Sequence, residues 1–148
     1  MEKYILIVVG IFLIWLLLNF AILLIRKTTT HNTFKKLEKL LKKRYVLLNK
    51  IELKTDSLRY LKELESLPEG IKYLNRKLAL NYIISQDLLK NYNENIFSDE
   101  YKILDSEIRH IGNIYNNKAT HLKTSVEIFP TALMARFMNI KTVDFYRG

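Results

Sequence analysis

A long uncharged run near the N-terminus constrains this chain more than any other feature. Residues 4–25 read YILIVVGIFLIWLLLNFAILLI and contain no charged side chain. At about 1.5 Å per residue, a helix of this length spans the roughly 30 Å hydrocarbon core of a bilayer. A cleavable signal peptide has a shorter apolar stretch and a small-x-small cleavage site, whereas this run ends in ILLIRKTTT. We therefore predict an uncleaved transmembrane helix over residues 4–25, preceded by a short extracytoplasmic segment, residues 1–3.

The charges that flank this run predict its direction in the membrane. The net charge of +9 is concentrated in residues 26–50, which hold nine lysines and arginines against the single acid Glu38, whereas residues 51–148 hold 14 bases and 13 acids. The N-terminal flank offers only Lys3 and the α-amino group. Because basic flanks stay on the cytoplasmic side, we expect a single-pass, N-out and C-in protein of a bacterial plasma (inner) membrane. Residues 26–148 are then its cytoplasmic domain.

The basic juxtamembrane segment, residues 26–50, has three readings. It can act only as a determinant of topology, it can contact anionic lipid headgroups at about 1 kcal/mol per base near the surface, or it can bind nucleic acid. The nearly neutral remainder of the chain and the lack of a recognition fold argue against nucleic acid as a partner. The candidate lipid-contacting residues are Arg26, Lys27, Lys35, Lys36, Lys39, Lys42, Lys43 and Arg44.

Apolar residues beyond the basic segment recur at helical spacing and predict three long helices. The first is expected from His31 to Leu67, and the β-branched residues 28–30 weaken its link to the membrane helix without settling whether the two are continuous. A turn is expected at residues 67–70, which contain a proline and a glycine. The apolar stripe of this first helix consists of Phe34, Leu37, Leu41, Leu48, Ile51, Leu58, Leu61 and Leu64.

The second and third helices complete an all-α prediction. The second carries Ile71, Leu74, Leu78, Tyr82, Leu89 and Tyr92 and fades into a polar loop at residues 91–95. Ser98 is the expected N-cap of the third helix, whose stripe is Tyr101, Leu104, Ile108, Ile111, Tyr115, Ala119, Leu122, Val126 and Phe129. None of these helices can bury its stripe alone, so we predict an antiparallel bundle of three long helices plus a short C-terminal helix, attached to the transmembrane helix.

Pro130 separates the third helix from a second apolar run. A proline disfavours helical geometry at the preceding residue and suits the first turn of a new helix, so the third helix is expected to end or kink there. Leu133, Met134, Phe137 and Ile140 then form a short apolar helix. Two readings stay open for it: it folds back to cap the bundle, or it lies on the membrane or on a partner.

No constellation of residues for catalysis or metal binding is apparent. The chain has no cysteine, and its four glycines could hardly supply a phosphate-binding loop. The histidines are His31, His110 and His121, and no two of them have the i,i+3 or i,i+4 spacing of a helical metal site. The acids lie among lysines and arginines on polar faces. We therefore expect no enzyme, no cofactor, no metal and no small-molecule substrate.

The C-terminal third, IYNNKATHLKTSVEIFPTALMARFMNI, resembles the C-terminal signature of the LemA family. Tyr115-Asn116 lies 14 residues before Phe129-Pro130, as in the family's pattern, and Ala135 fits the alanine five residues after the proline. Phe145, followed by Tyr146, resembles the closing aromatic pair. The sequence departs from the pattern at several positions, among them Gly112, where an arginine is frequent, and Asn139, where a glycine is frequent.

The resemblance implies a bacterial, membrane-anchored helical bundle with a cytoplasmic domain and no enzymatic residues. LemA-like proteins have no established molecular function and often accompany membrane proteases and other envelope proteins. The leading hypothesis is therefore a scaffold or accessory factor that contacts an unidentified membrane or cytoplasmic protein. The alternative is a structural protein that acts on the bilayer by binding anionic lipid through the basic segment, and an enzyme with an unrecognised site is a third hypothesis.

Overall fold

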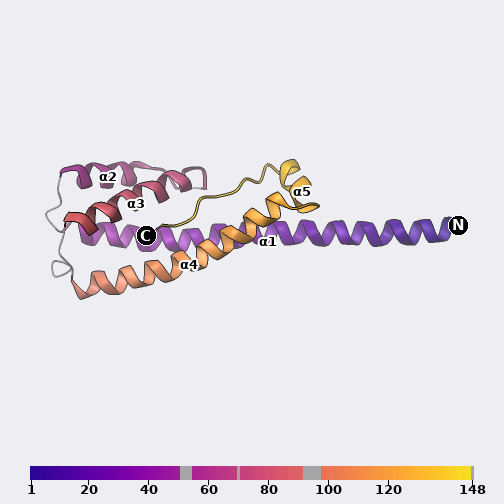
Figure 1. Cartoon of the computed structure of the whole chain (residues 1–148), viewed down its shortest axis with the longest axis horizontal. Coiled ribbons are helices and arrows are strands. Elements are labelled where there is room, and N and C mark those ends of the chain that lie inside the picture. Colours follow the sequence, from indigo (N-terminus) through magenta and orange to yellow (C-terminus); the bar gives the residue numbers. More distant parts are fainter. Residues whose placement is uncertain (51–54, 70, 92–97, 148) are drawn as a thin grey trace.

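The computed structural model describes residues 1–50, 55–69, 71–91 and 98–147, and within these ranges every regular element is helical. The all-α prediction is thus confirmed for the described residues. After α5 the chain runs back along the domain as an extended tail, residues 138–147 (Figure 1). The elements are α1 (Glu2–Leu48), α2 (Thr55–Ser66), the short 3₁₀ helix η1 (Ile71–Tyr73), α3 (Leu74–Asn91), α4 (Asp99–Glu127) and α5 (Thr131–Phe137).

Helix α1 is a single helix of 47 residues with two different halves. Its N-terminal half extends away from the other helices, and it is long and apolar enough to cross a membrane by length and composition. Its C-terminal half, beginning near Leu23, carries buried residues and packs into the domain. The open question of continuity is thereby answered, because the helix runs without a break through residues 28–30.

Two of the three threonines that weaken this link on propensity, Thr29 and Thr30, make side-chain hydrogen bonds. The Oγ1 atoms of Thr29 and Thr30 donate to the carbonyl of Arg26, at 3.2 and 2.7 Å. Thr30 also lies 3.2 Å from the carbonyl of Lys118 on α4. Tertiary packing therefore overrides the modest propensity cost of β-branched residues at this point.

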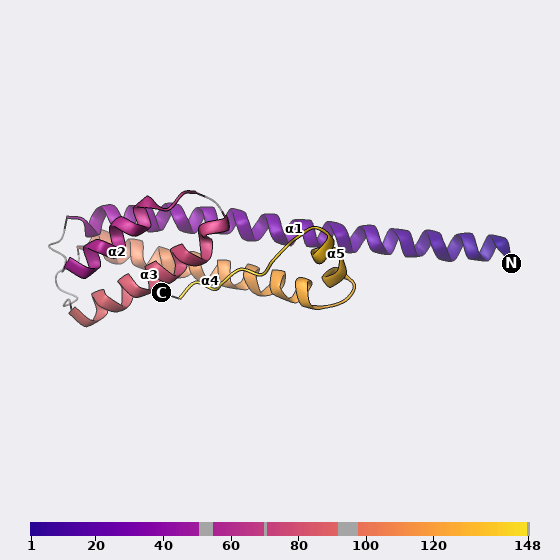
Figure 2. The same ribbon diagram turned by 90° about the horizontal axis from the view of Figure 1, so that it is seen from above.

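Helix α4 lies alongside the C-terminal half of α1 and runs in the opposite direction (Figures 1 and 2). Thr30 contacts Lys118, and further along α1 the ring of Phe34 lies 5.9 Å from the ring of Tyr115. Near the end of α1, Arg44 contacts Tyr101. Successive residues along α1 thus contact residues progressively earlier in α4, as in any antiparallel pair of helices.

The expected helix from residue 31 to residue 67 is two helices, and that prediction was wrong. Helix α1 ends at Leu48, a turn follows at residues 49–50, and α2 begins at Thr55; Ile51 lies outside the described residues. Because α4 begins at Asp99, beside the end of α1, a longer α1 would extend past its partner and leave its stripe in water. Helix α2 instead packs on α3, where Leu61 and Leu64 are buried and Leu58 is partly exposed.

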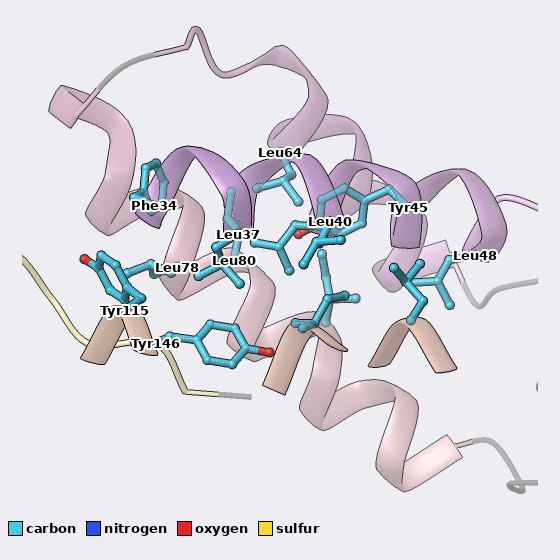
Figure 3. Close-up of a cluster of buried hydrophobic side chains, with 14 of the residues drawn as sticks. Phe34, Leu37, Leu40, Tyr45, Leu48, Leu64, Leu78, Leu80, Tyr115 and Tyr146 are labelled. Carbon is cyan, nitrogen blue, oxygen red and sulfur yellow. The ribbon is translucent and has the colours of Figure 1, made fainter. Parts of the chain in front are cut away.

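One large apolar cluster joins α1, α2, α3, α4 and the C-terminal tail. Figure 3 shows α1 side chains facing residues of α2, α3, α4 and the C-terminal tail. Tyr45 on α1 donates a hydrogen bond to Asn81 of α3 (3.1 Å). Burial of Tyr45 raises the pKa of its phenol, so this group stays protonated as a donor. The labelled members are Phe34, Leu37, Leu40, Tyr45, Leu48, Leu64, Leu78, Leu80, Tyr115 and Tyr146.

The expected stripe of the second helix was only half right. Leu74 and Leu78 are buried, but Tyr82 and Leu89 are exposed; Tyr92 and the rest of the loop at 92–95 lie outside the described residues. Polar side chains occupy part of the buried face, so the spacing of apolar residues alone does not identify the whole face. This face consists of Leu74, Lys77, Leu78, Leu80, Asn81, Ile84, Ser85 and Leu88.

Both predicted ends of α4 are confirmed. Ser98 accepts a hydrogen bond from the backbone N–H of Tyr101 (3.2 Å), as an N-cap does. At the other end α4 stops at Glu127, and Pro130 directly precedes the new helix α5. The predicted stripe of α4 is buried or half-buried up to Val126, whereas Phe129 was wrongly assigned to it, because its side chain is 73% exposed.

Candidate functional site

The eight candidate lipid-contacting residues occupy three different environments. Arg26, at the end of the apolar run, is half-buried and its Nη1 donates to Ser125 Oγ and to the carbonyl of His121 on α4. Lys27 is exposed beside it. This arginine therefore fixes the C-terminal end of α4 against α1.

The lysine stripe is the second environment. Its residues are exposed and are spaced by one or three positions, which places them on one face of α1, away from the buried side. Lys42 pairs with Glu69 at 2.5 Å; this hydrogen bond raises the pKa of Lys42 and lowers that of Glu69. Such an exposed pair contributes little to stability. The stripe consists of Lys35, Lys36, Lys39, Lys42 and Lys43.

Arg44 is the third environment, and its assignment to lipid contact does not fit the fold because the residue is only 4% exposed. Its Nε donates to the Tyr101 hydroxyl at 3.1 Å, one Nη donates to Ser85 Oγ at 3.0 Å, and the other lies 3.6 Å from the Asp105 carboxylate. Burial opposes the charge of Arg44, but Tyr101 and Asp105 raise its pKa above the usual range. It is a buried cation that joins α1, α3 and α4.

The straight course of α1 decides which bases can reach lipid headgroups. At 1.5 Å per residue, Lys35 lies about 15 Å and Lys43 about 27 Å beyond Ile25 along the helix. The headgroup layer is only about 5–8 Å thick on each side of the hydrocarbon core. The field of an anionic surface then falls off within a Debye length of about 8 Å. If residues 4–25 span a bilayer, Arg26 and Lys27 lie among the headgroups and most of the lysine stripe lies beyond them.

The family-motif residues gather in two places. In the first, Tyr115 and Asn116 on α4 hold the C-terminal tail. The Tyr115 hydroxyl donates to the carbonyl of Asp144 (2.8 Å), and burial raises the pKa of this phenol. The Asn116 amide bonds both the N–H and the carbonyl of Tyr146, at 2.7 and 2.8 Å. Phe145 packs against the large apolar cluster from the same tail.

Replacing Asn116 with alanine removes both bonds to the Tyr146 backbone. Because one donor and one acceptor are left without their partner, we expect the free energy of unfolding to fall by about 1–3 kcal/mol. Thermal unfolding of the full chain in lipid nanodiscs, followed by circular dichroism, measures this. Asn117→Ala is the control, since Asn117 is exposed on the same turn, and equal melting temperatures for the two variants would contradict the role of Asn116.

Asn139 and Gly112 are each suited to the backbone at their positions. Asn139 has a positive φ of 51°, a conformation that glycine and asparagine adopt more readily than other residues. A Cβ on Gly112 would lie 2.2 Å from Cδ1 of Tyr146, so glycine lets the tail approach α4. An asparagine thus suits the turn at position 139, and Gly112 is matched to Tyr146.

The second motif group lies at the α4–α5 corner. Ala135 is fully buried in a small cluster with Leu23 of α1, Leu122 of α4 and Ile140 of the tail. Pro130 is half-buried and Phe129 is exposed. The inner face of the short helix therefore folds back onto the bundle, as one of the two interpretations predicted. Leu133 and Phe137 lie on its exposed face.

A cavity of about 490 Å³ lies between α1 and the turn that connects α2 to α3. Sequence reasoning missed it, because it depends on the break of the expected first helix. Its polar groups include two ion pairs, Glu38–Lys77 and Lys42–Glu69, and its lining is otherwise mainly apolar. Across the described ranges no three His, Cys, Asp or Glu side chains are grouped to hold a metal ion. The cavity adjoins the lysine stripe through Lys42.

No family model, curated protein or solved structure matches this chain. Its function is therefore inferred from the sequence and from the geometry of the lysine stripe, the cavity and the α4–α5 corner.

Proposed function

We propose that this chain is a LemA-like, single-pass membrane protein whose antiparallel helical domain acts as a cytoplasmic scaffold or accessory factor. Its partner is a protein with an acidic surface segment, bound by the lysine stripe. The observation that carries this proposal is the position of the stripe on α1, exposed and directed away from the core. Complementary charge speeds association and excludes wrong partners, which suits a scaffold.

The cavity beside the stripe supports the same proposal. A partner segment that pairs with the lysines can place an apolar side chain among Leu41, Tyr45 and Leu64, which line the cavity. Buried apolar anchors supply most of the affinity of many protein interfaces, while surrounding charges set the register. A stripe joined to a cavity therefore offers both elements of a docking site.

The alternative, a bilayer-acting protein that binds anionic lipid through the basic segment, has weaker support. Only Arg26 and Lys27 lie within the headgroup layer when α1 stands in a bilayer, and Arg26 is already bonded to Ser125. Arg44 is buried. A membrane tilt of about 20° changes the height of the stripe by less than a tenth, so tilt does not bring most of it to the surface.

Crosslinking in native membranes tests the proposal. Photo-crosslinkers placed at Val46, which lines the cavity, should capture a discrete protein in cells. Charge reversal of Lys35, Lys36, Lys39 and Lys43 to glutamate should abolish this product. The matched control reverses four exposed lysines elsewhere: Lys62, Lys72, Lys90 and Lys102. Equal crosslinking in both variants, or capture of lipid alone, would overturn the proposal.

A further inference from the structure

Four large apolar side chains gather in water-accessible positions at the α4–α5 corner. Ile128 and Phe129 lie in the connection between the helices, and Leu133 and Phe137 lie on α5. Phe129 is 73% exposed and Phe137 is 85% exposed. A grouped patch of this kind marks an interaction surface, unlike single exposed apolar residues.

The patch is one face of a corner whose other face is packed. Leu133 and Phe137 are four residues apart on α5, so they point to the same side, and Phe129 is exposed in the connection directly before this helix. Ala135 and Thr131, between them, are buried. The corner is therefore fixed to the domain by its inner face, and its outer apolar face has no cover within the described residues.

The position of the corner along the axis of α1 indicates what contacts its outer apolar face. Ala135 packs in one cluster with Leu23, which is two residues before the end of the apolar run at Ile25. Arg26 holds the end of α4 at the same level through Ser125. Both views show α5 beside α1 where its unaccompanied half begins (Figures 1 and 2). The corner thus lies at the level where the hydrocarbon core would meet the headgroups.

We propose that the α4–α5 corner is a second membrane contact, with Phe129, Leu133 and Phe137 inserted into the lipid leaflet on the domain's side. This inference rests on the proposed membrane anchoring of α1, on which the inner face of the corner packs at Leu23. Arg136 is exposed on α5 between Leu133 and Phe137, and the exposed Lys27 follows Arg26 on α1 at the level of the corner, as expected for a surface that meets headgroups; Glu127 is the acid directly before Ile128.

A second membrane contact would restrict the movement of the domain more than a single transmembrane helix does. A single transmembrane helix lets the domain rotate and tilt, whereas an inserted corner fixes both movements. The lysine stripe is then held at a constant height and direction above the membrane. A partner that is itself embedded in the membrane would meet the stripe in one orientation.

The inference is tested with a tryptophan reporter in the full chain, because Trp15 is the only native tryptophan. The reporter variant carries Trp15→Phe and Phe137→Trp. It is reconstituted into vesicles of phosphatidylcholine and phosphatidylglycerol, without bromine or with bromine on the acyl chains, near the headgroups for position 137 and near the chain ends for Trp15 at the middle of the span. We expect brominated lipid to remove most of the reporter's emission. Trp15→Phe with Tyr82→Trp is the control, since Tyr82 is an exposed aromatic residue on α3, and its emission should not change.

The unmodified chain separates the two ways in which the test can fail. If Trp15 is quenched while the reporter at position 137 behaves like the one at position 82, the anchor stands and the second contact is overturned. If Trp15 itself is not quenched, α1 is not in the bilayer, and both the proposed anchoring and this inference are overturned.

Discussion

Replacing Arg44 with alanine is expected to lower the free energy of unfolding by about 3–5 kcal/mol, because it leaves buried polar partners without their cation. Tyr101 and Ser85 each lose a hydrogen-bond donor, and Asp105 loses an ion-pair partner. For a chain of this size, the melting temperature falls by on the order of 10 °C. Circular dichroism of the full chain in nanodiscs measures the loss.

The neighbouring residue supplies the control for this experiment. Lys43 is basic, precedes Arg44 directly and is exposed in the lysine stripe. Lys43→Ala should therefore change stability by less than about 0.5 kcal/mol. If both variants melt like the unmodified chain, Arg44 does not join the helices, and the packing of α1 against α3 and α4 around this cation is incorrect.

Replacing Phe34 with alanine is expected to cost a similar amount, about 3–5 kcal/mol, through the loss of buried ring surface and the cavity left behind. Phe34 is 1% exposed in the large cluster and packs on Tyr115 across the α1–α4 contact. Chemical unfolding in mild detergent, which gives the free energy directly, is the appropriate measurement.

Phe137 provides the matched substitution of the same residue type on the exposed side. Because its ring is 85% exposed, Phe137→Ala should leave the unfolding free energy in detergent nearly unchanged. A large loss at Phe137, or none at Phe34, would contradict the division between a packed core and an exposed corner. If the Phe137 ring capped the bundle, Phe137→Ala would lower the free energy of unfolding as much as Phe34→Ala does.

Features that depend on local sequence were predictable. The uncharged run identifies a helix that can cross a membrane, and the regular spacing from Tyr101 to Val126 identifies α4. The N-cap at Ser98 and the helix break at Pro130 follow from the chemistry of single residues. Each of these signals acts within a few turns of the helix, so no knowledge of the tertiary partner is needed.

Features that depend on a partner helix were not predictable. The end of α1 at Leu48 has no proline or glycine beside it, and it coincides with the start of α4. Arg44 was expected among the lipid-contacting bases, but partners that are distant in sequence make its burial possible, and Lys77 is buried in the same way beside Glu38. A search for apolar residues at helical spacing passes over buried polar residues. For the same reason it missed half of the buried face of α3.

The candidate site shows the same division. A run of lysines was visible in the sequence, but its height above a membrane depends on whether α1 continues past residues 28–30. The motif residues were visible too, but their roles depend on the tail that Tyr115 and Asn116 hold. The corner patch could be read only as one of two alternatives, because α5 has one packed and one exposed face.

In the proposed arrangement, one straight helix, α1, serves both as membrane anchor and as core of the domain. The chain has no cysteine, so spin labels at Leu18→Cys and Lys43→Cys allow a direct distance measurement by double electron–electron resonance. These exposed positions are 25 residues apart on nearly the same face. A continuous α1 predicts a narrow distribution centred near about 38 Å. A broad distribution with a much shorter mean, from a break at residues 28–30, would contradict this arrangement.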